Sequence, residues 1–122
     1  MKKILESDVK KKVKDLLDWV GKRVPIYTMT PATFGYGESG HPDRLLYIKG
    51  YLLGIECKLD GNTSLLRPEL KPTQSEKAQK IMLRRLRAAG GYPIVVHKDN
   101  LKEFKVLLEN IIGMDIDVKV DL

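Results

Sequence analysis

Three stretches of the sequence place apolar residues three or four positions apart, which is the spacing of an amphipathic helix. Residues 5–21 show this spacing, with lysines on the opposite face and a glycine as the stop signal. A second helix is expected to run to residue 89, with Thr73 or Ser75 as its cap and a pair of glycines after it. A third is expected to follow Asn100, another cap residue.

Four shorter stretches have the composition of strands: residues 24–30, 44–48, 51–59 and 92–97. The second and third of these flank Lys49-Gly50, which predicts a β-hairpin. The segments 31–42 and 60–72 are expected to be loops, since both are rich in turn-forming residues. The second loop is long for so small a domain, and loops of that length tend to be functional or mobile.

The C-terminal tail, residues 114–122, alternates strictly between apolar and polar side chains, which predicts a half-buried strand. Such a strand either closes an edge of the chain's own sheet or reaches a second subunit. The predicted order is therefore α-β-β-β-α-β-α, with the tail as a candidate final strand. This order describes one α/β domain, residues 1–122, in which helices flank a mixed β-sheet.

The composition is typical of one soluble, globular domain, because 43% of the 122 residues are hydrophobic and 31% are charged. No apolar run approaches the roughly 20 residues that a membrane crossing needs, and we find no secretory signal segment. We therefore expect no membrane partner. Cys57 is the only cysteine and cannot form an internal disulfide, which favours a reducing, cytoplasmic setting.

The net charge is +6 and the pI is about 9.4, which favours a polyanionic partner such as nucleic acid. The positive charge is concentrated in residues 71–87, which hold one acid, Glu76, and six bases: Lys71, Lys77, Lys80, Arg84, Arg85 and Arg87. A solvated helix face explains such a run by itself. An adjacent catalytic site would make it a surface for the phosphate backbone of DNA.

The candidate chemistry lies at the end of the predicted hairpin. Side chains alternate along a strand, so Glu56 and Lys58 share one face, about 6.5–7 Å apart, and Cys57 points to the other. Antiparallel pairing across the turn brings Asp43 to the Glu56 end. Two carboxylates and a backbone carbonyl are hard oxygen ligands that suit Mg²⁺. The lysine could hold an attacking water or neutralise the charge that develops on a phosphate.

Two further polar residues are candidates for the same site, and each has an ordinary structural interpretation as well. Glu6 lies within the apolar stripe of the first helix, where a core-facing carboxylate must be paired, neutral or bound to metal. Alternatively, it is an exposed acid favoured by the helix dipole. Gln74 lies at the edge of the apolar face of the second helix, and a capping or surface glutamine is the alternative there.

These residues together resemble a known nuclease pattern. Asp43 in "GHPD", followed by Glu56 and Lys58 in "IECK", is similar to the PD-(D/E)xK motif. The resemblance extends to the VRR-NUC subfamily through the first helix, the glycine-rich run before Asp43, the "LKPTQ" segment and the "GGYPIVV" strand. It spans roughly residues 6–112 and leaves the tail outside. Minimal, standalone members of that subfamily are encoded by viruses or bacteria.

The resemblance implies a restriction-endonuclease-like core with a Mg²⁺ or Mn²⁺ site. Asp43, Glu56 and the backbone carbonyl of Cys57 would bind the metal, and Glu6 would contribute through a water. The implied activity is hydrolysis of DNA phosphodiester bonds, selective for branched structures such as four-way junctions and carried out by a homodimer. The setting would be the cytoplasm of a bacterium or of a virus-infected host cell.

The resemblance also implies that Lys58 is the catalytic lysine and that Gln74 orients this lysine or the water. His41 occupies the variable position of the motif, where it could touch phosphate or metal or simply lie on a surface loop. Cys57 is interpreted as a small core residue and not as a nucleophile, because the sequence offers it no histidine partner.

Three functions remain open from the sequence. The leading hypothesis is the metal-dependent endonuclease, with the basic helix and the lysines of residues 10–14 and 22–23 holding the flanking backbone. The alternative is a DNA-binding or accessory module that keeps the fold without cutting. The third is a structural α/β domain whose charged residues are incidental.

Overall fold

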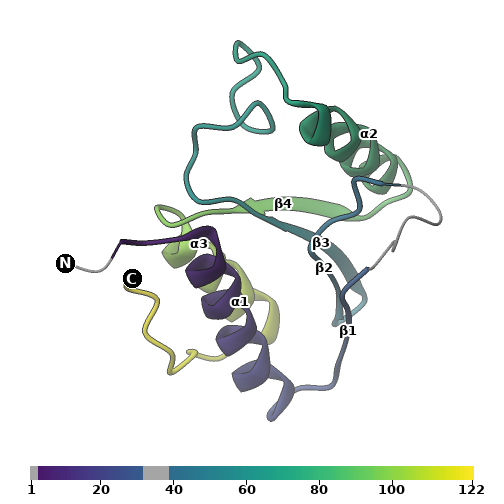
Figure 1. Ribbon diagram of the computed structural model, residues 1–122. Coiled ribbons are helices and arrows are strands. Elements are labelled where there is room, and N and C mark those ends of the chain that lie inside the picture. The colour runs from purple at the N-terminus through teal and green to yellow at the C-terminus, as the bar shows by residue number, and fades with distance from the viewer. Residues whose placement is uncertain (1–2, 32–38) are drawn as a thin grey trace.

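The described part of the chain folds into a mixed sheet of four strands with three helices packed on it (Figure 1). The computed structural model describes residues 3–31 and 39–122. The predicted order α-β-β-β-α-β-α is confirmed over these ranges, as is the mixed α/β class. The elements are α1 (Glu6–Gly21), β1 (Ile26–Met29), β2 (Arg44–Ile48), β3 (Tyr51–Cys57), α2 (Gln74–Ala88), β4 (Tyr92–Val96) and α3 (Leu101–Ile112).

The strands lie in the order β1-β2-β3-β4, so β1 and β4 are the two edges. The first three strands are antiparallel, and β4 runs parallel to β3 after the crossover through α2. The predicted hairpin is present, with Ile48 opposite Tyr51. Both turn residues have positive φ, 51° at Lys49 and 85° at Gly50, which is the backbone that a two-residue hairpin turn requires.

The core lies between one face of the sheet and the pair α1 and α3 (Figure 1). Alternation sends Leu53, Ile55 and Cys57 of β3 into this core. The opposite face of β3 approaches α2 so closely that a Cβ on Gly54 would lie 2.2 Å from a methyl carbon of Leu86. Glycine at this position therefore lets the helix pack directly on the strand.

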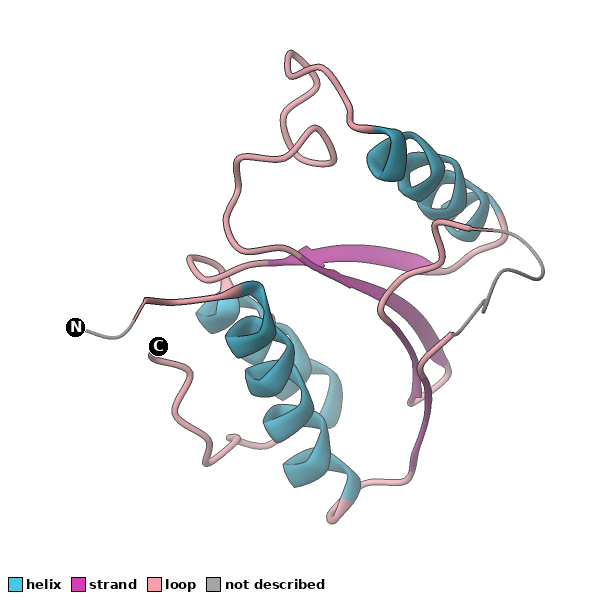
Figure 2. Cartoon of the chain, viewed as in Figure 1, coloured by secondary structure: helices cyan, strands magenta, loops and turns pink. Residues whose placement is uncertain are grey.

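The predicted C-terminal strand is wrong. Residues 114–122 form no strand and run as a loop beside α1 and α3 (Figure 2). Ile116 is buried, and Val118 and Val120 pack against the core, so the alternating pattern covers the helices instead of extending the sheet. Lys105 Nζ donates to the Val118 carbonyl at 2.9 Å, which replaces a strand partner.

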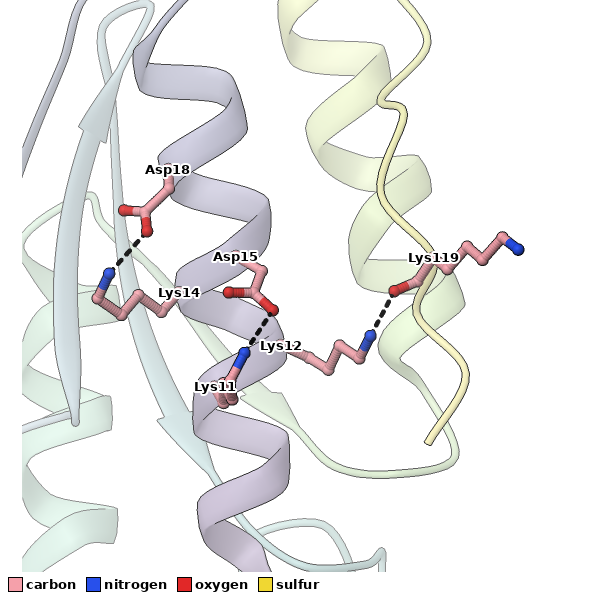
Figure 3. Close-up of polar contacts among 6 residues, drawn as sticks. All are labelled: Lys11, Lys12, Lys14, Asp15, Asp18 and Lys119. Carbon is pink, nitrogen blue, oxygen red and sulfur yellow. Dashed lines mark hydrogen bonds and ion pairs between the residues drawn. The ribbon is translucent and has the colours of Figure 1, made fainter.

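The lysines of α1 already have partners within the chain. Lys11 Nζ lies 3.3 Å from an Asp15 carboxylate oxygen, and Lys14 pairs with Asp18 in the same way one turn on (Figure 3). Lys12 Nζ donates to the Lys119 carbonyl of the tail at 2.8 Å (Figure 3). The predicted role of this segment in holding DNA stays a prediction, and these contacts reduce the charge that it can offer.

The helix caps differ in what they bind. Thr73 caps α2 as predicted, accepting a hydrogen bond from the Glu76 N–H at 3.1 Å. Asn100 precedes α3, but its side chain does not cap that helix. Its Oδ1 accepts from the His97 N–H at 2.7 Å and its Nδ2 donates to the Val95 carbonyl at 2.8 Å, so Asn100 fastens the end of β4. Within the described ranges, none of the helices combines the length and apolar character of a membrane span.

Candidate active site

Asp43 and Glu56 face each other where the hairpin opens. Arg44 pairs with Ile55 in the antiparallel register, so the next opposed positions are Asp43 and Glu56. Asp43 Oδ2 accepts a hydrogen bond from the Cys57 N–H at 2.7 Å, which fixes the aspartate against β3. The expected convergence of these two carboxylates at one strand end is therefore present in the structure.

The carboxyl group of Glu56 is buried and incompletely satisfied. The residue is only 3% exposed, and its Oε2 has no hydrogen-bond partner among the described residues. Burial, followed by the hydrogen bond to Asp43 and that residue's charge, raises the pKa of Glu56 to about 9. Lys58 and Lys10 oppose this shift without cancelling it. Within residues 3–31 and 39–122, Glu56 is thus a buried acid whose ionised form has no counter-charge in direct contact.

The side chain and the backbone of Cys57 have different roles. The thiol lies in the core, and burial raises its pKa to about 12, so it remains protonated at neutral pH. A strand residue directs its N–H and C=O toward the same neighbour. Because the Cys57 N–H reaches Asp43, its carbonyl is directed to the Asp43 side as well. This is the side on which the expected metal would take its third oxygen ligand.

Lys58 is held by a residue that the sequence did not single out. Its Nζ donates to Gln79 Oε1 of α2 at 3.0 Å, in a partly buried contact. Gln74, the glutamine favoured from the sequence, is the first residue of α2 and is exposed. The two glutamines are five positions apart on one helix, and only the placement of the helix over β3 decides which of them reaches the lysine.

Glu6 does not point into the core, so of its two interpretations the exposed acid is confirmed and the core-facing carboxylate is wrong. Its side chain is 45% exposed and pairs with Lys10 at 3.6 Å. Lys10 Nζ also lies 3.5 Å from Asp43 Oδ1, so one ammonium group links α1 to the candidate site. Although burial lowers it, the charges of Asp43 and Glu6 hold the pKa of Lys10 above its usual value. The i, i+4 spacing of Glu6 and Lys10 was the available signal for this pair.

The segment that leads into Asp43 lies against α2. Gly40 has φ of +86°, and a Cβ there would lie 2.4 Å from the Ala78 carbonyl carbon and oxygen. Glycine is therefore needed both for the backbone conformation and for the close approach. His41 is exposed at this point, in agreement with the surface interpretation. Most of the glycine-rich run that precedes it, residues 32–38, lies outside the described residues.

The long loop before α2 is anchored to that helix by Glu76. Thr63 Oγ1 donates to Glu76 Oε2, and Ser64 Oγ donates to Oε1 at 3.0 Å. The Thr73 N–H donates to the same carboxylate at 3.0 Å, which completes a capping box. These hydrogen bonds, first that of Thr63, lower the pKa of Glu76 to about 2. The loop after Lys58 is thus pinned next to the lysine.

Five of the six predicted DNA-binding bases are exposed on or just before α2, and Lys80 is half-buried. All of them except Lys71 lie on α2, the helix that packs on the Gly54 face of β3 and whose Gln79 holds Lys58, so the basic run belongs to an element that contacts the candidate site (Figure 1). Proximity to such a site was the condition under which this run was expected to contact a phosphate backbone.

The residues present suit a hard divalent cation. Over residues 3–31 and 39–122, no group of three or more His, Cys, Asp or Glu side chains is placed to hold a metal. The expected set needs only two side chains, Asp43 and Glu56, with the Cys57 carbonyl as the third oxygen. The unpartnered Glu56 Oε2 is the atom that such a cation would satisfy.

No family model, no curated protein and no solved structure matches this chain. What the site does is therefore inferred from its geometry and its chemistry.

Replacing Glu56 by glutamine is expected to stabilise the metal-free protein. The folded state holds a proton on Glu56 up to a pKa of about 9, whereas the unfolded chain releases it near 4.5. The free energy of unfolding therefore falls as the pH rises between these values. At about pH 8, in EDTA, we expect Glu56→Gln to raise that free energy by about 1–3 kcal/mol in urea denaturation.

Glu76→Gln is the matched control, since Glu76 is also a buried glutamate, but its pKa is lowered where that of Glu56 is raised. The lowered pKa of Glu76 contributes stability above its usual value of 4.5, and this is lost as the pH falls toward about 2. We expect this variant to be less stable than the wild type at neutral pH. If Glu56→Gln lowered the free energy of unfolding instead, the interpretation that the buried Glu56 carboxylate lacks a compensating charge would be wrong.

Proposed function

We propose that the chain is a Mg²⁺- or Mn²⁺-dependent endonuclease that hydrolyses DNA phosphodiester bonds through a restriction-endonuclease-like, VRR-NUC-like core. The observation that carries this proposal is the pair of opposed carboxylates, Asp43 and Glu56, with an unpartnered buried oxygen on Glu56. The amine of Lys58 follows on the same strand face, held in place by Gln79. A binding module gains nothing from a buried acid of this kind, which argues for chemistry at the site.

The proposed division of labour follows from the contacts. Asp43, Glu56 and the Cys57 carbonyl would hold the metal, which supplies Lewis-acid stabilisation of phosphate charge and a lower pKa for water. In the reaction, a water oxygen bonds to phosphorus as the bond to the leaving oxygen breaks. The water gives one proton to solvent, and the leaving oxygen takes one proton from solvent. Lys58 would donate to a phosphate oxygen and offset the developing negative charge. Glu6 would act through a water at the open side of the site.

The surroundings support a nucleic acid substrate. The exposed bases on and before α2, Lys71, Lys77, Arg84, Arg85 and Arg87, together with the half-buried Lys80, are proposed to contact the backbone phosphates. Binding of this kind weakens steeply with salt and carries little sequence preference, so selectivity would come from DNA structure, such as branch points. The free, buried Cys57 supports a reducing, cytoplasmic setting.

Cleavage of labelled branched DNA is expected with Mg²⁺ or Mn²⁺ and is expected to cease in EDTA. Asp43→Asn should abolish the activity, because it removes one of the two carboxylate ligands. Lys58→Ala should lower kcat by about 10²- to 10⁴-fold, as loss of a charge-stabilising group does. The measurement is product formation on flap, four-way, duplex and single-stranded substrates.

Two results would count against this assignment. Activity that survives both Asp43→Asn and Lys58→Ala would place the chemistry elsewhere. Metal-independent binding without cleavage by the wild type would favour the accessory module. Mg²⁺ should also raise the melting temperature of the wild type and not that of Asp43→Asn, which reports on the metal site without any activity.

Gln79 is proposed as the residue that positions Lys58, and its removal should affect turnover more than binding. We expect Gln79→Ala to lower kcat by about 10- to 100-fold with little change in KM, since loss of a supporting contact around a metal site typically lowers activity by this factor. Gln79→Glu keeps an acceptor oxygen and should retain most of the activity. Gln74→Ala, at the exposed glutamine of the same helix, is the matched comparison. A larger loss for Gln74→Ala would overturn this assignment in favour of Gln74.

A homodimer is part of the proposal, because cutting both strands of a symmetric junction requires two active sites. The tail packs on its own chain, so we propose that another surface forms the dimer contact. Among the described residues, β4 is an edge strand, and it adjoins an apolar groove of about 360 Å³. Tyr51 and Tyr92 line it from the sheet, in edge-to-face contact, and Leu107 lines it from α3. An uncovered strand edge beside apolar surface suits pairing with a second copy.

Light scattering is expected to give twice the mass of 13.9 kDa for the wild type. Leu107→Glu places a charge in the groove and should yield a folded monomer. Val106→Glu, on the neighbouring exposed position of α3 that does not line the groove, should leave the dimer intact. A wild-type monomer at micromolar concentration, or equal effects of the two substitutions, would contradict this dimer.

A further inference from the structure

A hollow of about 370 Å³ lies between the C-terminal half of α1 and the first two strands. Its lining includes Leu17, Asp18, Gly21 and Lys22 from the helix, and Thr28 and Arg44 from the strands. Gly21 packs directly on β1, because a Cβ there would lie 3.2 Å from Ile26 Cδ1. The helix and the strand therefore meet closely, and the hollow forms without any movement of its walls.

The guanidinium group of Arg44 has unused hydrogen-bonding capacity at this hollow. Its Nη1 donates to Thr28 Oγ1 at 3.3 Å, and no carboxylate within residues 3–31 and 39–122 forms an ion pair with it. A guanidinium carries five N–H donors, so most of them remain for another acceptor. The Thr28 hydroxyl accepts from Arg44 and keeps its own proton to donate. Adjacent guanidinium and hydroxyl donors suit an anion with several oxygens.

The acid in the lining does not supply that anion. Asp18 Oδ2 lies 2.6 Å from Lys14 Nζ, so its charge is already paired (Figure 3). Lys22 is exposed at the C-cap of α1, where it offsets the partial negative charge of the helix end. Three bases, Lys14, Lys22 and Arg44, thus face one acid, and the excess positive charge favours an anionic ligand.

The hollow lies on the same side of α1 as the candidate active site. Lys10 Nζ lies 3.5 Å from Asp43 Oδ1, and Leu17 follows Lys10 by two helical turns, about 10 Å along the axis. On the sheet, Arg44 follows Asp43 directly and pairs with Ile55, a core residue, so its side chain is on the α1 face. A DNA strand that leaves the site along α1 therefore reaches the hollow.

We propose that this hollow binds a backbone phosphate of the DNA strand on one side of the cleaved bond, with Arg44, Thr28 and Lys22 as donors. This inference deepens the proposed endonuclease function and rests on it. Phosphates repeat along a strand, so a strand with one phosphate at the carboxylates carries another toward the hollow. The basic run of α2 lies on the other face of the sheet, so contacts on both faces would fix the direction of the strand.

Fluorescence anisotropy of a labelled four-way junction over a range of salt concentrations, in EDTA, tests this proposal without any cleavage. Arg44→Gln should weaken binding by about 10-fold, as loss of a charge-assisted hydrogen bond does. It should also lower the slope of log K against log salt by about 1, because one phosphate contact is lost. Lys22→Gln changes an exposed residue and should lower the slope in the same way, so the test stands even if Arg44→Gln fails to fold.

Arg23→Gln is the matched control, since it removes the same charge from the residue next to Lys22. The Arg23 guanidinium lies 3.7 Å from the centre of the Trp19 ring and donates to the Trp19 carbonyl at 3.0 Å. Trp19 and Gly21 are two positions apart, so they lie on nearly opposite sides of α1. We therefore expect Arg23→Gln to keep the slope of the wild type.

Single neutral methylphosphonates, placed in turn along one strand of the junction, identify the phosphate that is bound. At one position the neutral group should weaken binding to the wild type by about 10-fold and binding to Arg44→Gln by less than about 2-fold. Two changes that remove the same contact are not additive, whereas changes at independent sites are.

The outcomes separate the two proposals. Coupling between Arg44 and one phosphate supports the hollow even if the wild type cuts no DNA, in which case the endonuclease proposal alone fails. Equal slopes for the wild type, Arg44→Gln and Lys22→Gln overturn the hollow even if cleavage is robust. Equal losses for Arg44→Gln and Arg23→Gln also overturn it, because they report only the net charge. Weaker binding by Arg44→Gln without coupling to any phosphate overturns it too, and would assign Arg44 to holding β2 against β1.

Discussion

The carboxyl group of Glu56 is buried beside Asp43, and one of its oxygens has no hydrogen-bond partner in the part of the chain that the structure describes; much of the structure around it follows from that constraint. A buried carboxylate without a counter-charge is unfavourable, so the metal-free protein keeps the proton on Glu56. Replacing it by an apolar side chain would serve stability better. The buried acid on this central strand therefore supports the proposal that a metal ion compensates it.

Helix α2 gives that strand end its shape. It packs on β3 through the missing side chain of Gly54 and supports the approach to Asp43 through that of Gly40. Its Gln79 holds Lys58, and its Glu76 ties down the loop that follows the lysine. One helix therefore sets the positions of Asp43, Lys58 and the loop of residues 60–72 together. Displacement of α2 would disturb all three, which makes the site a property of the packed domain and not of the hairpin alone.

The sequence predicted the parts of the site that depend on local rules. A two-residue turn at Lys49-Gly50 and the alternation of β3 are sufficient to place Asp43 opposite Glu56. The choice of Gln79 over Gln74 depends on how α2 lies across the sheet, which no local pattern encodes. The prediction of a C-terminal strand was wrong for a related reason. Alternation occurs both in a strand and in an irregular segment that packs one side on helices, and Ile116 is buried in a segment of the second kind.

The two lysines near the carboxylates differ in how firmly they are held, and this difference fits the proposed function. Lys10 reaches Asp43 from an exposed position at 3.5 Å, and exposed ion pairs of this kind contribute little to stability. A divalent cation at Asp43 could displace it at small cost. Lys58 is tied to Gln79 in a partly buried contact, and it would keep its place when the site is filled. In the proposed function, Lys10 would therefore be a counter-charge that the metal can displace, and Lys58 the fixed positive group that a phosphate would meet.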